Sequence, residues 1–294
     1  MSRKLGMVVA STILGVAGYT VAAFAEQVST FADRSRVVAV GGSITEIVFA
    51  LGEEDRLVAR DSTSVYPPEA SKLTDVGYIR QLSPEGVLSV NPSGILALHG
   101  AGPREAVEVL KKASVPYIEV PDTFDHAGIL TKIKAVGEAL GVEDKAEKLA
   151  AEVDASLKAA EAQTASIKDR KRVLFILSLQ DGKVLASGTE TAANGIIEMA
   201  GAVNAIDGYT GYKQVSDEAI IAAAPDVILM MDRGGNFAIT DEELFAQPGI
   251  LSTPAGAERK AIRMDGSYLL NFGPRTAASV SDLATALYGD RTGN

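Results

Sequence analysis

Tyr78 and Arg80 are the two residues whose types and spacing most suggest ligand chemistry. They lie in the segment Gly77-Tyr78-Ile79-Arg80, shortly before a predicted helix that begins after Ser83. In an extended segment, residues two apart point to the same side, so both side chains can address one ligand. A phenol has a pKa of about 10, a nearby guanidinium favours loss of its proton, and the resulting phenolate is a ligand for ferric iron. The alternative is a loop tyrosine that packs its ring against a surface arginine.

Histidines and further tyrosines offer a few secondary candidates. The chain has two histidines and no cysteine. His99 follows a predicted buried strand and precedes the glycine-rich segment 100–103, so it falls near the same edge as Tyr78, where ligand contact and ordinary exposure both remain open. His126 follows Asp125 at a predicted helix start, where a surface position is expected. Tyr209 and Tyr212 precede the second repeat described below and could line a pocket or pack within a loop.

No pattern in the sequence indicates a catalytic site. It lacks a G-x-S-x-G elbow, a Walker loop, an HExxH motif and a cysteine nucleophile, and its two histidines leave little general-base capacity. The carboxylates of Asp61, Asp75 and Asp232 are not spaced as a catalytic pair. The sequence therefore predicts that the protein is not an enzyme.

The first 25 residues are typical of a secretory signal peptide. Arg3 and Lys4 give a positive start, residues 5–23 are uncharged and mostly apolar, and an A-x-A cleavage site ends at Ala25. Polar residues and glycines interrupt the apolar run, which favours a cleaved signal peptide over a membrane anchor. Because the chain has no cysteine, no lipidated N-terminus is expected. We therefore expect a soluble protein exported to a periplasm, with Glu26 as its first residue.

Net charge and chain length further limit the classes of partner and the number of domains. Removal of the signal peptide leaves 26 basic and 38 acidic residues, a formal charge of −12, which argues against nucleic acid as a partner. The 269 residues that remain exceed the usual size of a single core, which favours two domains or one large one.

An internal repeat predicts two similar lobes. Short apolar runs alternate with helical patterns, which is typical of an α/β fold with mostly parallel sheets. Residues 83–96 match residues 216–229: each copy has a serine suited to cap a helix, a glutamate in the first turn, and a proline before a buried strand. Segments 36–40 and 172–176 open the two halves in the same way. We therefore expect two Rossmann-like α/β lobes.

A long helix is predicted between the halves. Residues 142–168 contain neither glycine nor proline, and Leu149, Val153 and Leu157 recur on one face. A helix of this length would run roughly 40 Å, so we interpret it as a rigid strut that permits only small hinge motion; a surface helix followed by a flexible linker is the alternative. The predicted division is a signal peptide at 1–25, a first lobe at 26–141, the inter-lobe helix at 142–168 and a second lobe at 169–294.

The segment from Asp75 to Ser89, DVGYIRQLSPEGVLS, resembles the haem-binding members of the periplasmic binding proteins that use a single inter-lobe helix. Shorter likenesses extend over nearly the whole mature chain, at 42–47, 66–70, 100–103 and 193–197. The resemblance implies a periplasmic carrier for iron acquisition. It would hold ferric haem (heme b) as cargo between its lobes and deliver it to an inner-membrane ABC permease and ATPase complex, with an outer-membrane haem receptor upstream. Relatives bind cobalamin and ferric siderophores, which are the alternative cargoes.

The resemblance also implies roles for particular residues. Tyr78 would be the axial ligand of the haem iron, and Arg80 would pair with a propionate. Family members commonly supply an arginine after the strand that follows the second repeat; Arg233 occupies that place and would hydrogen-bond the phenolate. Independently of the resemblance, the positions of His99 and Tyr212 make them candidates for further cargo contacts, with ordinary exposure or loop packing as the alternative. Because both histidines lie in the first half, a tyrosine and histidine pair across the lobes is not expected.

Two equivalent glutamates complete the expected set. Glu85 and Glu218 hold matching positions in the repeats, and the cobalamin-binding relative uses glutamates there to dock on its two permease subunits. The resemblance implies the same docking role. A first-turn glutamate also stabilises its helix by about 0.3–1 kcal/mol through the helix dipole, and both readings can hold together.

Overall fold

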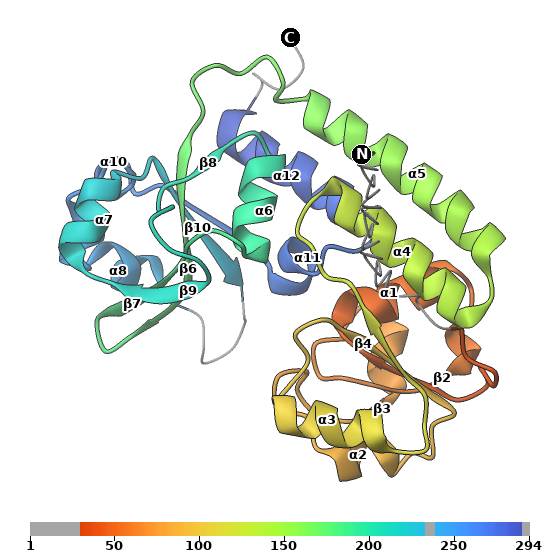
Figure 1. Ribbon diagram of the computed structural model, residues 1–294. Helices are drawn as coiled ribbons and strands as arrows, with labels where there is room; N and C mark the ends of the chain where they lie inside the picture. Colours follow the sequence, from red (N-terminus) through yellow and green to blue (C-terminus); the bar gives the residue numbers. More distant parts are fainter. Residues whose placement is uncertain (1–29, 233–238, 290–294) are drawn as a thin grey trace, which may run out of the picture.

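The computed structural model describes residues 30–232 and 239–289 (Figure 1). These residues form two α/β lobes, each built on its own sheet, which confirms the predicted fold class. The expected signal peptide and Arg233 lie outside the described residues. Among the described helices, none is both long and apolar enough to cross a membrane.

The first lobe contains a five-stranded parallel sheet in the order β3-β2-β1-β4-β5. Its strands are short, and β1 and β4 at the centre are wholly buried, as their continuous apolar sequences predict. The strands are β1 (Val37–Val40), β2 (Leu57–Arg60), β3 (Thr74–Asp75), β4 (Gly94–Leu98) and β5 (Tyr117–Val120). The helices are α1 (Gly42–Ala50), α2 (Pro84–Leu88), α3 (Arg104–Lys112) and α4 (His126–Leu140), with short 3₁₀ turns at Glu54–Arg56 and Pro68–Lys72.

The second lobe contains a mixed sheet in the order β11-β10-β6-β7-β9, with β8 paired to β6. Its strands are β6 (Arg172–Gln180), β7 (Lys183–Ser187), β8 (Val203–Asn204), β9 (Tyr212–Val215), β10 (Val227–Asp232) and β11 (Ala261–Asp265). The antiparallel β7 follows β6 through the two-residue turn Asp181-Gly182, in which both residues have positive φ, as a tight hairpin requires. Its helices are α6 (Ala192–Met199), α7 (Asp217–Ala223), α8 (Asp241–Phe245), α9 (Pro248–Leu251), α10 (Pro254–Ala257), α11 (Gly266–Leu270) and α12 (Thr276–Tyr288).

The repeated segments occupy equivalent places in the two lobes. The hydroxyl of Ser83 accepts a hydrogen bond from the backbone N–H of Gly86 at the start of α2, and Ser216 does the same for Ala219 at the start of α7. The strands that follow, β4 and β10, pair in parallel with β1 and β6, which open the two halves. The predicted internal repeat is therefore a structural repeat.

The helix between the halves is shorter than predicted. Helix α5 (Glu143–Ala162) has 20 residues, which corresponds to about 30 Å of length. Beyond Ala162 the chain turns, and the buried Thr164 donates its hydroxyl to the Glu161 carbonyl at 3.4 Å. Threonine and serine side chains compete with the helix for backbone groups, which accounts for the early end. Helix α5 packs one buried face against both α4 and α12 (Figure 1).

A single apolar cluster extends through both lobes. It runs from Val37 in β1 through Ile133 in α4 and Leu157 in α5 to Val173 in β6 and Leu283 in α12. Two smaller clusters fill the other face of each sheet. The lobes are therefore joined by a shared core in the α4, α5 and α12 layer, as well as by one connecting helix.

Candidate functional site

Tyr78 lies on an exposed loop that its neighbours hold in place. The loop follows β3, and the Tyr78 side chain remains 43% exposed. On one side, Ser62 donates its backbone N–H to the Gly77 carbonyl at 2.9 Å. On the other, Gly102 donates its backbone N–H to the Ile79 carbonyl at 2.9 Å. The loop is thus fixed from both sides while the phenol is accessible to a ligand.

Arg80 and Tyr212 are predicted site residues on different lobes. Tyr212 begins β9, and its ring meets Phe175 edge-on at a centroid distance of 6.3 Å. Burial raises the pKa of Tyr212 above its ordinary value of 10, while hydrogen bonds with Thr191 and Ala193 and the charge of Arg80 act in the opposite direction. The exposed Arg80 belongs to the first lobe, so its charge acts on Tyr212 from the other lobe.

His99 lies at the end of β4 with one ring nitrogen already engaged. Its Nδ1 is 2.6 Å from Oε1 of Glu119, and the other carboxylate oxygen of Glu119 accepts from Lys111 at 2.7 Å. The hydrogen bond from Lys111 is the largest cause that lowers the pKa of Glu119, and the bond with His99 adds to it. The His99 side chain is 71% exposed, so its Nε2 is accessible.

His126 differs from its expected surface position. It begins α4 after the Asp125 cap, as predicted, but its side chain is only 22% exposed. Nε2 is 2.9 Å from Oδ1 of Asp154, and Nδ1 is 3.2 Å from Oε2 of Glu161. His126 therefore joins α4 to α5, and nothing in its surroundings connects it with the Tyr78 loop.

The two predicted docking glutamates are both exposed. Glu85 lies in the first turn of α2 and Glu218 in the first turn of α7. The hydrogen bond with the Ser216 hydroxyl is the first cause that lowers the pKa of Glu218 below its ordinary value. Figure 1 places α2 at the outer end of the first lobe and α7 at the outer end of the second.

Two exposed residues near Tyr78 were not singled out from the sequence. Val65 and Tyr66 lie on the loop after β2, which the hydrogen bond between Ser62 and Gly77 joins to the Tyr78 loop. The sequence feature that could have identified them is an apolar pair in the loop after a strand, where the segment 66–70 that carries part of the family resemblance begins.

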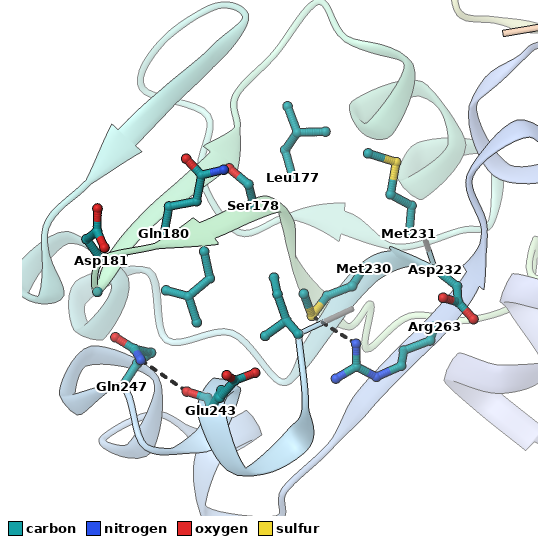
Figure 2. Close-up of a pocket in the computed structure, with 13 residues that line it drawn as sticks. Leu177, Ser178, Gln180, Asp181, Met230, Met231, Asp232, Glu243, Gln247 and Arg263 are labelled. Atoms are coloured by element: carbon teal, nitrogen blue, oxygen red, sulfur yellow. Dashed lines mark hydrogen bonds between the residues drawn. The ribbon is translucent and has the colours of Figure 1, made fainter. Parts of the chain in front are cut away.

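A pocket of about 380 Å³ lies in the second lobe, apart from these residues (Figure 2). Leu177, Leu179 and Met230 give it an apolar part, and Figure 2 shows Arg263 hydrogen-bonded to the Met230 sulfur. None of the described residues predicted for the site lines it. Asp232 and Ile239, which do line it, border residues that the structure does not describe.

Comparison with solved structures shows two close likenesses. The periplasmic heme-binding protein BhuT in complex with two hemes is 38% identical, with a TM-score of 0.80, covering 86% of this chain and 97% of that one. The periplasmic heme-binding protein RhuT from Roseiflexus sp. RS-1, in apo form, is 37% identical, with a TM-score of 0.83, covering 88% and 100%.

A curated relative is more distant. The vitamin B12-binding protein of Pectobacterium atrosepticum is 25% identical over 268 residues, covering 88% of this chain and 90% of its own. All three similar proteins are binding proteins, in agreement with the expectation that the chain is not an enzyme. Residues 37–268 match the family model described as periplasmic binding protein, so the chain belongs to the periplasmic binding protein family.

Proposed function

We propose that the protein binds ferric haem between its lobes and delivers it to an ABC importer of the inner membrane. The observation that carries this proposal is the 38% identity, over nearly all of its length, to a protein solved with two hemes bound. The likeness to a vitamin B12-binding protein favours cobalamin as the second candidate, but its identity of 25% is much lower.

Tyr78 is the proposed iron ligand. Its exposed phenol lies on a loop that hydrogen bonds hold on both sides, so little conformational freedom would be lost when it binds iron. Ferric iron is a hard Lewis acid and accepts a phenolate as an axial ligand. Arg80, exposed two residues away, would pair with a propionate.

Further contacts come from both lobes. Tyr212 of the second lobe is influenced by the charge of Arg80, and the accessible Nε2 of His99 is a second polar group at the carboxyl ends of the first-lobe strands. Arg233, which lies outside the described residues, follows β10 directly and keeps its proposed role as hydrogen-bond donor to the phenolate.

Export and delivery form the rest of the proposal. Residues 1–25 act as a cleaved signal peptide, and the mature protein receives haem in the periplasm downstream of an outer-membrane haem receptor. Glu85 and Glu218, exposed at the outer ends of their lobes, dock on basic pockets of the two permease subunits. A carboxylate on each lobe matches a permease with two similar subunits.

A haem titration of the purified mature chain tests the cargo. We expect a coloured complex with the absorption bands of ferric iron ligated by phenolate. Tyr78→Phe should lose those bands and most of the affinity. Tyr288→Phe is the control, because the Tyr288 hydroxyl lies at the far end of α12 and bonds the Gly201 carbonyl. Binding of cobalamin or a ferric siderophore in preference to haem would overturn the proposal.

A further inference from the structure

Half of the exposed large apolar side chains in the described residues, the proposed iron ligand among them, lie on two neighbouring loops. Six such side chains are exposed, and Val65, Tyr66 and Tyr78 are three of them. All three lie on the two loops joined by the hydrogen bond between Ser62 and Gly77. We call them the first-lobe apolar surface. Clustered apolar exposure next to a polar site is typical of a surface that a ligand covers.

A residue of the second lobe covers part of this surface. The Cζ of Arg275 lies 3.4 Å from the centre of the Tyr66 ring, which is the geometry of a cation–π contact. The ring of Tyr268 lies 5.4 Å from the same guanidinium. The Tyr66 side chain is still 38% exposed, so Arg275 covers part of the ring and leaves the rest open.

Glu46 holds Arg275 in this position. Its Oε2 accepts from Nε of Arg275 at 3.0 Å, and its Oε1 accepts from the Arg275 backbone N–H at 3.0 Å. Glu46 is only 4% exposed, so its carboxylate needs cationic partners, of which Arg275 is the one in direct contact. An arginine held through both its side chain and its backbone has little freedom to leave the Tyr66 ring.

We propose that Val65 and Tyr66 contact the apolar macrocycle of the cargo, and that Arg275 is a positioning residue that holds the Tyr66 ring for this contact. This inference rests on the proposed haem function. Haem presents a broad apolar face, and aromatic and aliphatic side chains gain most from covering such a face. The stack of Arg275 on Tyr66 fixes the ring before binding, so cargo binding need not order it.

The rate of haem loss to an excess of apomyoglobin measures these contacts. Tyr66→Ala should release haem about tenfold faster than the unaltered protein, as expected for one lost aromatic contact. Val65→Ala should release it about threefold faster. Val109→Ala is the matched control, because Val109 is an equally exposed valine of the first lobe on α3, and its variant should be unchanged.

A double variant separates positioning from a general structural role. Arg275→Lys should accelerate haem loss about fivefold, but should add nothing in the Tyr66→Ala background if Arg275 acts through that ring. Arg259→Lys is the control, because Arg259 stacks on Phe245 within the second lobe. Thermal unfolding of each variant is measured alongside, and release rates are compared below the unfolding range.

The outcomes distinguish the two proposals. If the unaltered protein takes up no haem, or Tyr78→Phe binds it unchanged, the proposed function fails. If Tyr78→Phe loses haem while Tyr66→Ala and Val65→Ala hold it as the unaltered protein does, only the contact inference fails. If Arg275→Lys accelerates haem release equally in the unaltered protein and in the Tyr66→Ala background, the positioning role of Arg275 is overturned. The proposed contacts of Val65 and Tyr66 with haem are then still supported.

Discussion

Gly195 in α6 lies so close to the carbonyl oxygen of Phe124 that a Cβ on Gly195 would be 2.1 Å from that oxygen. The two residues belong to different lobes, and the Phe124 ring also meets the ring of Phe272 edge-on at 5.4 Å. The second lobe therefore approaches the loop after β5 at a point where only glycine leaves enough room.

Gly195→Ala should destabilise the protein even though alanine favours helix formation. The propensity gain is about 1 kcal/mol, whereas a methyl group forced against a backbone carbonyl costs about 2–3 kcal/mol. Urea unfolding should show the difference. Gly86→Ala is the control, since the nearest atom to its Cβ would be 3.6 Å away; equal effects of the two substitutions would contradict the packing argument.

Glu46→Gln should lower the free energy of unfolding by about 3 kcal/mol, because it leaves the Arg275 guanidinium without its buried anionic partner. Glu147→Gln, which breaks the pair of Glu147 with Lys134 on the surface, should cost less than about 1 kcal/mol. Thermal and urea unfolding measure both. A similar small loss for each variant would show that the pair between the lobes contributes little.

Arg80→Gln should weaken haem binding about tenfold, as expected for one charge-assisted hydrogen bond to a propionate. The same variant should bind haem dimethyl ester as well as the unaltered protein does, because the ester has no carboxylate. Arg36→Gln serves as control, since Arg36 bonds the Val90 and Asn91 carbonyls at the other end of the sheet. Equal weakening toward haem and its ester would show that Arg80 does not meet a propionate.

The double variant Glu85→Ala, Glu218→Ala should abolish most haem import while leaving haem affinity intact, because both carboxylates are exposed on the outer helices. Growth on haem as iron source and uptake in reconstituted vesicles measure the first effect, and titration measures the second. Glu147→Ala, Glu152→Ala on the exposed face of α5 is the matched control. Normal import by the docking variant would refute the assignment.

The repeat made the lobes predictable because its signals are local. A serine cap, a first-turn glutamate and a proline before a buried strand act within about a dozen residues, so residues 83–96 and 216–229 reveal α2, β4, α7 and β10 without knowledge of the rest. The end of α5 was missed, because side chains of a polar segment compete for the backbone in a way that composition does not show.

The contacts between lobes could not be predicted in the same way. Glu46 and Arg275 are 229 residues apart, and although Glu46 lies in the recognised segment 42–47, nothing local to either residue indicates its partner. His126 was placed at a helix start, but its partners lie 28 and 35 residues further along the chain. Tyr78 and Arg80 could be proposed from the sequence because both belong to one short segment, whereas Tyr66 gains its significance only from the neighbouring loop and from Arg275.

The core shared by α4, α5 and α12 affects how haem can be released, because it resists separation of the lobes. A wide separation of the lobes would expose apolar side chains of that core to water, and the free energy required is well above thermal energy. If the lobes of a haem carrier cannot separate on their own, haem would be released only when the docked importer forces the lobes apart. We therefore expect the rate of haem transfer to be set by ATP turnover in the importer, rather than by spontaneous opening of the free protein.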